Sequence, residues 1–158
     1  MNVRAAEDAE IDRLATIWHE GWHQAHAQIL PAELTRLRTL ENFRERLQTA
    51  LPNVRVVGPL GEAVGFCIVK GDELYQLYVS VQARGSGAAA ALIADAEARL
   101  AEADVETAWL ACAIGNERAA RFYEKSGWRR AGTVVYHPDA AHETLALEVW
   151  RYEKRLHR

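Results

Sequence analysis

Residues 77–91 carry the clearest chemical signal in the chain. An apolar segment leads directly into Arg84, Gly85, Ser86 and Gly87, and an alanine-rich segment follows. A helix that begins here leaves four backbone N–H groups unpaired and carries about half a positive charge at its start. Because glycine lacks a Cβ, an anionic ligand can approach these donors closely. The spacing predicts a diphosphate site beside Arg84, with a tight turn and a solvated arginine as the alternative.

Two common glycine-rich phosphate motifs fit this segment incompletely. An NTP-binding loop requires Lys and then Ser or Thr after its last glycine, whereas alanines follow Gly87. A dinucleotide-binding fingerprint is partly met by Gly85, Gly87 and Ala90. That fingerprint also requires an acidic residue at the end of the next strand, where residues 113–116 read A-I-G-N. A nicotinamide-dependent oxidoreductase is therefore the less favoured alternative.

A third interpretation rests on resemblance to a known family. Arg84-x-x-Gly87-x-Ala89 resembles the Q/R-x-x-G-x-G/A acetyl-CoA signature of the GCN5-related N-acetyltransferase (GNAT) superfamily. Residues 77–81, L-Y-V-S-V, resemble the strand that leads into this signature. Residues 116–128, N-E-R-A-A-R-F-Y-E-K-S-G-W, are similar to the second motif of the family, N-x-x-A-x-x-F-Y-x-x-x-G-F.

The resemblance is close over residues 70–136 and implies where an acetyl-CoA co-substrate binds. It implies a sheet that opens between the strand ending at Val81, where the family usually has proline, and the strand at residues 107–114. The pantetheine arm would lie in that gap, and the diphosphate would lie on the amides of residues 84–89. The implied cofactor-binding residues are Leu77, Tyr78, Val79, Val81, Arg84, Gly85, Ser86, Gly87, Ala88, Ala89, Asn116, Phe122, Tyr123 and Lys125, with Arg118 and Arg121 as alternatives to Lys125.

Acetyl transfer to an amine requires loss of a proton from the amine, stabilisation of an oxyanion and a proton for the departing thiolate. By the resemblance, Tyr123 is the general acid, and a packed core aromatic is the alternative. The resemblance also implies that a backbone N–H near Val79 binds the oxyanion. Glu73, at the start of the same strand and facing the cleft, is the candidate base, acting directly or through water. An ordinary exposed strand-edge glutamate is the alternative for Glu73.

The first predicted helix contributes candidates for the acceptor site. His19, His23 and His26 follow one another at spacings of four and three residues, which places them on one flank beside Trp22. No acidic motif accompanies them, so neither a zinc site nor another metal is expected. Since this helix borders the acceptor site in the family, the resemblance implies an amine pocket formed by Trp22, His23, His26, Glu73 and Tyr75.

Hydrophobic periodicity predicts the elements that position these residues. Helices are predicted at residues 7–29, 34–51, 88–103 and 116–125. The helix at residues 34–51 is either continuous or broken near Thr39. Strands are predicted at residues 54–58, 63–70, 73–81, 107–114, 128–136 and 144–152. This order predicts an α/β (α+β) fold. With the resemblance, it becomes a GNAT-type mixed, mostly antiparallel twisted sheet of six or seven strands flanked by about four helices.

Length and composition fit a single domain over residues 1–158. The chain has 158 residues, of which 49% are hydrophobic and 26% charged. A net charge of −3 argues against nucleic-acid binding, and the absence of a long apolar run argues against a membrane span. The N-terminus lacks the pattern of a signal peptide, which predicts a cytoplasmic protein. Cys67 and Cys112 lie in apolar runs and are expected to be core thiols, with no disulfide, zinc site or covalent thiol route.

The sequence thus predicts an N-acetyltransferase that transfers an acetyl group from acetyl-CoA to a primary amine by direct attack in a ternary complex. The acceptor is a small molecule or a peptide N-terminus, and cationic amines, aminoglycosides and polyamines all suit the mild negative charge. A catalytically silent acyl-CoA-binding or interaction module is the alternative from another class. The last strand, residues 144–152, either pairs in a homodimer or stays internal.

Overall fold

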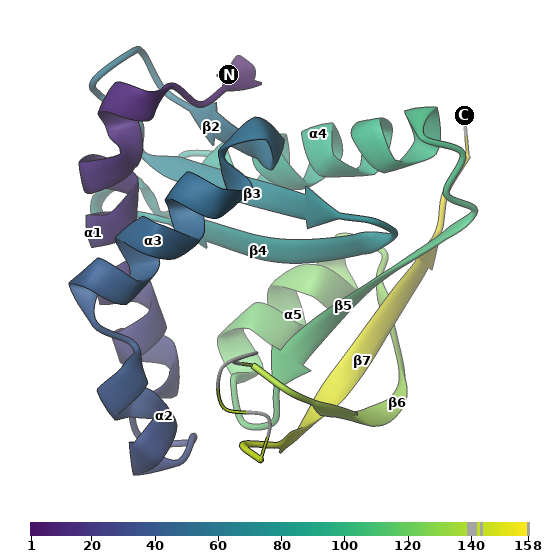
Figure 1. Ribbon diagram of the computed structural model, residues 1–158. Coiled ribbons are helices and arrows are strands. Elements are labelled where there is room, and N and C mark those ends of the chain that lie inside the picture. The colour runs from purple at the N-terminus through teal and green to yellow at the C-terminus, as the bar shows by residue number, and fades with distance from the viewer. Residues whose placement is uncertain (139–141, 143, 158) are drawn as a thin grey trace.

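The computed structural model describes residues 1–138, 142 and 144–157, and these form one open seven-stranded sheet (Figure 1). The strands are β1 (Val3–Ala5), β2 (Val54–Val57), β3 (Gly65–Lys70), β4 (Glu73–Val79), β5 (Thr107–Ala113), β6 (Arg129–Tyr136) and β7 (Leu147–Arg155). Their order across the sheet is β1-β2-β3-β4-β5-β7-β6. Neighbouring strands are antiparallel except β4 and β5, which run parallel. The predicted mixed, mostly antiparallel sheet is confirmed, and a mostly parallel dinucleotide-binding fold is excluded.

Helices cover both faces of this sheet. In the described residues they are α1 (Ile11–His26), α2 (Ala32–Leu37), α3 (Leu40–Ala50), α4 (Ala88–Glu102) and α5 (Glu117–Lys125), with short 3-10 turns η1 (Asp8–Glu10), η2 (Leu51–Asn53) and η3 (Val81–Ala83). Figure 1 shows α1 and α3 on one face of β3 and β4 and α4 on the other. Trp18, Phe43 and Phe66 centre one core, and Leu92 and Leu110 belong to the second. No helix within the described ranges is long and apolar enough to cross a bilayer.

The second predicted helix is two helices because the chain breaks beside Thr39. Arg38, which follows α2, has a non-helical ψ of 65°. The Oγ1 atom of Thr39 accepts a hydrogen bond from the backbone N–H of Asn42 at 3.1 Å, which caps the start of α3. The break turns Arg38 inward, where 3% of the residue is exposed. Its guanidinium donates to the side chain of Asn42 at 3.0 Å and to the carbonyl of Pro138 at 2.7 Å.

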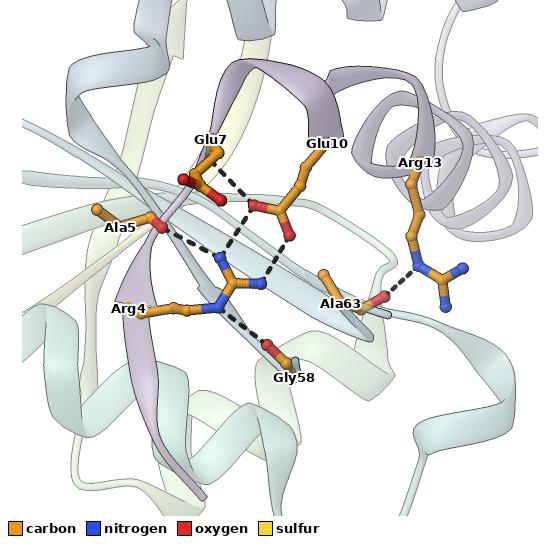
Figure 2. A network of polar contacts seen from close by, with 7 residues as sticks. All are labelled: Arg4, Ala5, Glu7, Glu10, Arg13, Gly58 and Ala63. Atoms are coloured by element: carbon orange, nitrogen blue, oxygen red, sulfur yellow. Dashed lines mark hydrogen bonds and ion pairs between the residues drawn. The ribbon is translucent and has the colours of Figure 1, made fainter. Parts of the chain in front are cut away.

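The short strand β1 is absent from the sequence prediction, since three residues with a central arginine carry no strand periodicity. It pairs with β2 and is fixed by an ion pair between Arg4 and Glu10 (Figure 2). The Nη2 atom of Arg4 lies 2.6 Å from Oε1 of Glu10, and its Nη1 atom lies 3.0 Å from Oε2. The Nε atom of Arg4 donates to the carbonyl of Gly58 at 3.1 Å. The hydrogen bond from Arg4 lowers the pKa of the buried Glu10 carboxyl.

The two central strands, β4 and β5, touch only where they begin. Glu73 lies opposite Trp109, and the backbone N–H of Trp109 donates to the carbonyl of Asp72 at 3.2 Å. Beyond this point β4 continues its pairing with β3, and β5 continues its pairing with β7. Figure 1 shows β4 and β5 diverging toward their carboxyl ends. The divergence leaves the facing edges of the two strands open, as the sequence resemblance implied.

The last strand is internal. β7 pairs with β5 on one side and with β6 on the other along its length. Leu145 belongs to the core that contains Trp18, and Val149 is also buried. A homodimer through β7 is therefore excluded, because both of its hydrogen-bonding edges are already used within the chain.

Candidate active site

The diverging halves of β4 and β5 enclose a cavity of about 510 Å³. Residues 74–79 of β4 line one wall, and residues 111–113 of β5 line the opposite wall. Residues of the helices α1 to α5 and of the strands β6 and β7 complete it. Gly21 allows α1 to lie close to β4, since a Cβ at this position would lie 2.7 Å from Cδ1 of Tyr78. The elements that the sequence motifs predicted therefore form part of the cavity wall.

The start of α4 presents several free backbone donors to this cavity. Gly87 precedes the helix in a left-handed conformation, with φ of +90°. A Cβ at Gly85 or Gly87 would meet no atom within 4 Å, so the backbone conformation, rather than space, requires glycine in this structure. The first helical hydrogen bond runs from Ala91 to the carbonyl of Gly87 at 3.0 Å. The amides of Ala89 and Ala90 therefore lack helical acceptors and suit an anion.

The turn itself uses some of the amides that the sequence assigned to the diphosphate. The N–H of Arg84 donates to the carbonyl of Val81 at 3.3 Å, and the N–H of Ser86 donates to that of Ala83 at 3.2 Å. The hydroxyl of Ser86 accepts from the N–H of Ala88 at 3.3 Å. Ser86 therefore stabilises the turn and does not line the cavity.

Two guanidinium groups lie near this helix start. Arg84 lines the cavity, and its Nη2 atom donates to Oε1 of Gln24 on α1 at 2.6 Å. Arg118 of α5 also lines the cavity. Burial and the nearby charge of Arg118 both lower the pKa of Arg84. A ligand anion would relieve the repulsion between the two cations. Lys125, which was preferred to Arg118 for the ribose phosphate, does not line the cavity.

Most other predicted cofactor residues do lie on the cavity wall. The predicted residues on the wall are Leu77, Tyr78, Val79, Arg84, Gly85, Gly87, Ala88, Ala89, Asn116, Phe122 and Tyr123. Val81 does not line the cavity, because it lies in η3 after the strand has ended and is 47% exposed. The arrangement suits a long ligand with an anionic group at the α4 end.

Tyr123 lies on α5 and lines the cavity. Its ring packs against those of Trp128 and Tyr152, at centroid distances of 6.4 and 6.3 Å. Asn116 begins this helix, since its side-chain oxygen accepts from the N–H of Ala119 at 3.3 Å. Burial raises the pKa of Tyr123 well above its usual value, so the phenol keeps its proton at neutral pH. A protonated phenol at a cavity wall can donate a proton.

Glu73 is buried rather than exposed to the cleft, contrary to the prediction. A β-bulge is the reason: Gln76 pairs with Ile68 and Leu74 pairs with Val69, which leaves Tyr75 without a partner in β3 and interrupts the alternation. Burial raises the pKa of Glu73 to about 7. The hydroxyl of Tyr136 donates to Oε2 of Glu73 at 3.4 Å. Tyr136 itself lines the cavity, so Glu73 reaches the cavity through this hydroxyl.

The predicted acceptor residues divide into two groups. Trp22, His26 and Tyr75 line the cavity, whereas His23 does not. The Nε2 atom of His23 lies 2.7 Å from the carbonyl of Arg38, so this histidine joins α1 to the end of α2. Burial lowers the pKa of His26 to about 4, which keeps its ring neutral at pH 7. The described residues contain no group of three metal-binding side chains.

The cavity residues that sequence analysis missed include Arg38, Arg46 and Tyr136. Arg46 lies on α3, and its guanidinium stacks over the ring of Trp18 at 4.3 Å from the centroid. It also donates to the hydroxyl of Tyr75 at 2.9 Å. An arginine on an amphipathic helix normally indicates a solvated face, so its sequence position carried no signal.

The cysteines offer poor nucleophiles. Burial raises the pKa of both Cys67 and Cys112 to about 12, so both are thiols at neutral pH. Cys112 lines the cavity, but a thiol is a much weaker nucleophile than a thiolate. Neither cysteine is therefore a good candidate for a covalent nucleophile.

The divergence of β4 from β5 and the start of α4 beside it are the features that the resemblance to acetyltransferases implied. Residues 11–128 match the acetyltransferase (GNAT) family, and the chain belongs to that family. Uncharacterized N-acetyltransferases of Mycobacterium tuberculosis and Mycobacterium bovis are 38% identical over 88 residues, which is 52% of this chain and 56% of each relative. The match thus spans little more than half the length of these curated relatives.

Solved structures show the same fold over nearly the whole chain. A GCN5-related N-acetyltransferase from Rhodopseudomonas palustris superposes with a TM-score of 0.75 at 20% identity, over 98% of this chain and 95% of that one. The PaiA N-acetyltransferase of Thermoplasma acidophilum, solved in complex with coenzyme A, has a TM-score of 0.66 at 18% identity. That alignment covers 98% of each chain. The GNAT fold inferred from the sequence is therefore confirmed.

Proposed function

We propose that this chain is an acetyl-CoA-dependent N-acetyltransferase that transfers an acetyl group to a primary amine within a ternary complex. The divergence of β4 from β5 beside the open start of α4 is the observation that carries the proposal. It provides unpaired strand edge for an extended amide-containing chain and free N–H groups for a diphosphate. These features, with Arg84 and Arg118, fit acetyl-CoA. When bound, acetyl-CoA supplies an activated thioester carbonyl.

Tyr123 acts as the general acid in this proposal. Its hydroxyl remains protonated because burial raises the pKa of Tyr123, and Tyr123 lines the cavity. The phenol gives its proton to the sulfur as the carbon–sulfur bond breaks. A backbone N–H on the open edge of β4 near Val79 stabilises the oxyanion.

Glu73 acts as the base through Tyr136. The attacking amine gives a proton to the Tyr136 hydroxyl, which in turn passes its own proton to Oε2 of Glu73 at 3.4 Å. A carboxyl with a pKa of about 7 is partly ionised at neutral pH and can both accept and release this proton. The nitrogen–carbon bond forms as the amine loses its proton, so the charges balance.

Calorimetry with CoA and a thiol-release assay over an amine panel test this proposal. Wild-type protein should bind CoA and release thiol only when an amine acceptor is present. Tyr123→Phe should bind CoA normally and lower kcat about 100-fold or more. Tyr152→Phe removes a hydroxyl that contacts Glu124 outside the cavity, and this matched control should retain its turnover.

The outcomes separate the proposal from its alternative. Absence of CoA binding at millimolar concentration would overturn the cofactor assignment. CoA binding without turnover of any amine would identify a silent acyl-CoA-binding module. Full activity in Tyr123→Phe would remove Tyr123 from the mechanism and leave water as the proton donor.

A further inference from the structure

Positively charged side chains predominate among the described charged residues that line the cavity. Its described lining residues include Arg46, Arg84 and Arg118, and no aspartate or glutamate. His26 adds no charge at pH 7, because burial lowers its pKa to about 4. A cavity lined in this way attracts anionic ligands and repels cationic ones.

The arginines lie in two separate places. Arg84 follows the end of β4, whereas Arg46 contacts Tyr75 near the start of the same strand. Tyr75 and Val79 are four residues apart, which is about 13 Å along an extended strand. The two contacts on α1, Gln24 with Arg84 and Trp18 with Arg46, are six residues or about 9 Å apart on the helix. The diphosphate site beside α4 therefore does not account for the charge of Arg46.

Arg46 is held in position by contacts that leave its charge uncompensated. Its guanidinium stacks over Trp18 at 4.3 Å and donates to the Tyr75 hydroxyl at 2.9 Å. Among the described residues, no carboxylate forms an ion pair with it. The charge also opposes the rise in the pKa of Tyr136, so Arg46 is close enough to act at the proposed proton relay. A fixed guanidinium that keeps free N–H groups in a cavity is suited to bind a carboxylate in two-point fashion.

We propose that the acceptor is a small amine that also carries a carboxylate, as an amino acid does, and that this carboxylate pairs with Arg46. This inference rests on the proposed function, in which the amine of the acceptor lies toward Tyr136. The amine of the acceptor then lies toward Tyr136 while its carboxylate pairs with Arg46, and these two residues lie in the same part of the cavity. Polyamines and aminoglycosides, which the net charge of the chain allowed, are disfavoured because they place a second cation near Arg46.

A panel of matched acceptors tests the proposal. Amino acids are compared with the amines that result from their decarboxylation, and O-phosphoethanolamine is compared with ethanolamine, with kcat/KM expressed per neutral amine. Wild-type protein should prefer each carboxylate-bearing acceptor to its decarboxylated partner by about tenfold or more, as expected for a charge-assisted hydrogen bond. Preference for the phosphoamine alone would overturn the carboxylate assignment.

Arg46→Gln is the decisive variant, and its effect is measured as the change in that preference. The ratio of kcat/KM between the two acceptors of a pair should fall about tenfold or more. Arg44→Gln is the matched control, because Arg44 lies on the same helix and pairs with Asp12 and Glu41 outside the cavity. The control should keep the wild-type preference. Arg46→Gln must also bind CoA like the wild type, which shows that the variant is folded.

A binding measurement separates failure of this inference from failure of the proposed function. Calorimetry follows the binding of amino acids to the CoA-loaded protein, which cannot transfer an acetyl group. Arg46-dependent binding without any turnover would support the acceptor class and overturn the transferase function. Turnover of decarboxylated amines, with the same preference in Arg46→Gln and wild type, would support the transferase function and overturn the acceptor class. Absence of both amino-acid binding and amino-acid turnover would also overturn the acceptor class.

Discussion

The burial of Glu73 should be measurable in the stability of the protein. Burial raises the pKa of this carboxyl from 4.5 to about 7, so the folded state holds a proton that the unfolded state releases. The stability contributed by the neutral form is complete below about pH 4.5 and is lost as the pH rises through about 7. At alkaline pH the loss amounts to about 3 kcal/mol.

Glu73→Gln removes the titrating group but keeps the shape of the side chain. The free energy of unfolding of the variant, relative to wild type, should therefore increase by about 3 kcal/mol between about pH 4.5 and about pH 8. Urea unfolding at a series of pH values measures this difference. Glu62→Gln, at an exposed position in a turn, is the control and should show no such trend. A difference for Glu73→Gln that stays constant with pH would refute the argument.

The same titration should appear in catalysis. In wild type, kcat/KM per neutral amine should rise through about pH 7 as Glu73 loses its proton, and Glu73→Gln should abolish this rise. Because Glu73 accepts the proton through the Tyr136 hydroxyl, Tyr136→Phe should lower kcat/KM and abolish this rise as well. An unchanged pH profile in Tyr136→Phe would show that the hydroxyl does not pass the proton to Glu73 during turnover.

The start of α4 and the ion pair of β1 give two further predictions. Gly87→Ala forces a Cβ into a left-handed conformation at a cost of about 1–2 kcal/mol, so both stability and CoA affinity should fall in unfolding and calorimetric titrations. Gly61→Ala, with φ of +80° in a turn outside the cavity, should lose stability but keep CoA affinity, and equal affinities in the two variants would contradict a role for the α4 start. Arg4→Met leaves Glu10 buried without its partner and should cost about 3–5 kcal/mol at neutral pH. Because the pKa of Glu10 is lowered in the fold, this loss should shrink as the pH falls below about 4.5, and a loss independent of pH would show that charge is not its cause.

Local sequence signals predicted the elements that build the cofactor half of the cavity. Gly87 before an alanine-rich segment indicated the helix start, and Asn116 indicated the next one, because each signal depends only on neighbouring residues. The break near Thr39 was visible for the same reason. Strand β1 carried no such signal, since it depends on pairing with β2 and on the contact of Arg4 with Glu10.

The acceptor half depended on contacts that sequence spacing does not encode. Tyr136 reaches Glu73 across 63 positions of the chain, and Arg46 is positioned by Trp18 on another helix. The position of Glu73 at the start of a strand suggested that it faces the cleft, whereas the bulge at Tyr75 changes which faces the neighbouring residues occupy. The site residues named from the family motifs remain predictions until variants are assayed.

The absence of a side chain at Gly21 sets how closely α1 approaches β4, and therefore how wide the cavity is. Glycine inside a helix costs about 1 kcal/mol relative to alanine, yet α1 retains it where the helix crosses the ring of Tyr78. A single added methyl group would act as a wedge between the helix and the sheet. Gly21→Ala is therefore the smallest change that would push α1 outward, and it offers a starting point for engineering the enzyme toward bulkier acceptors.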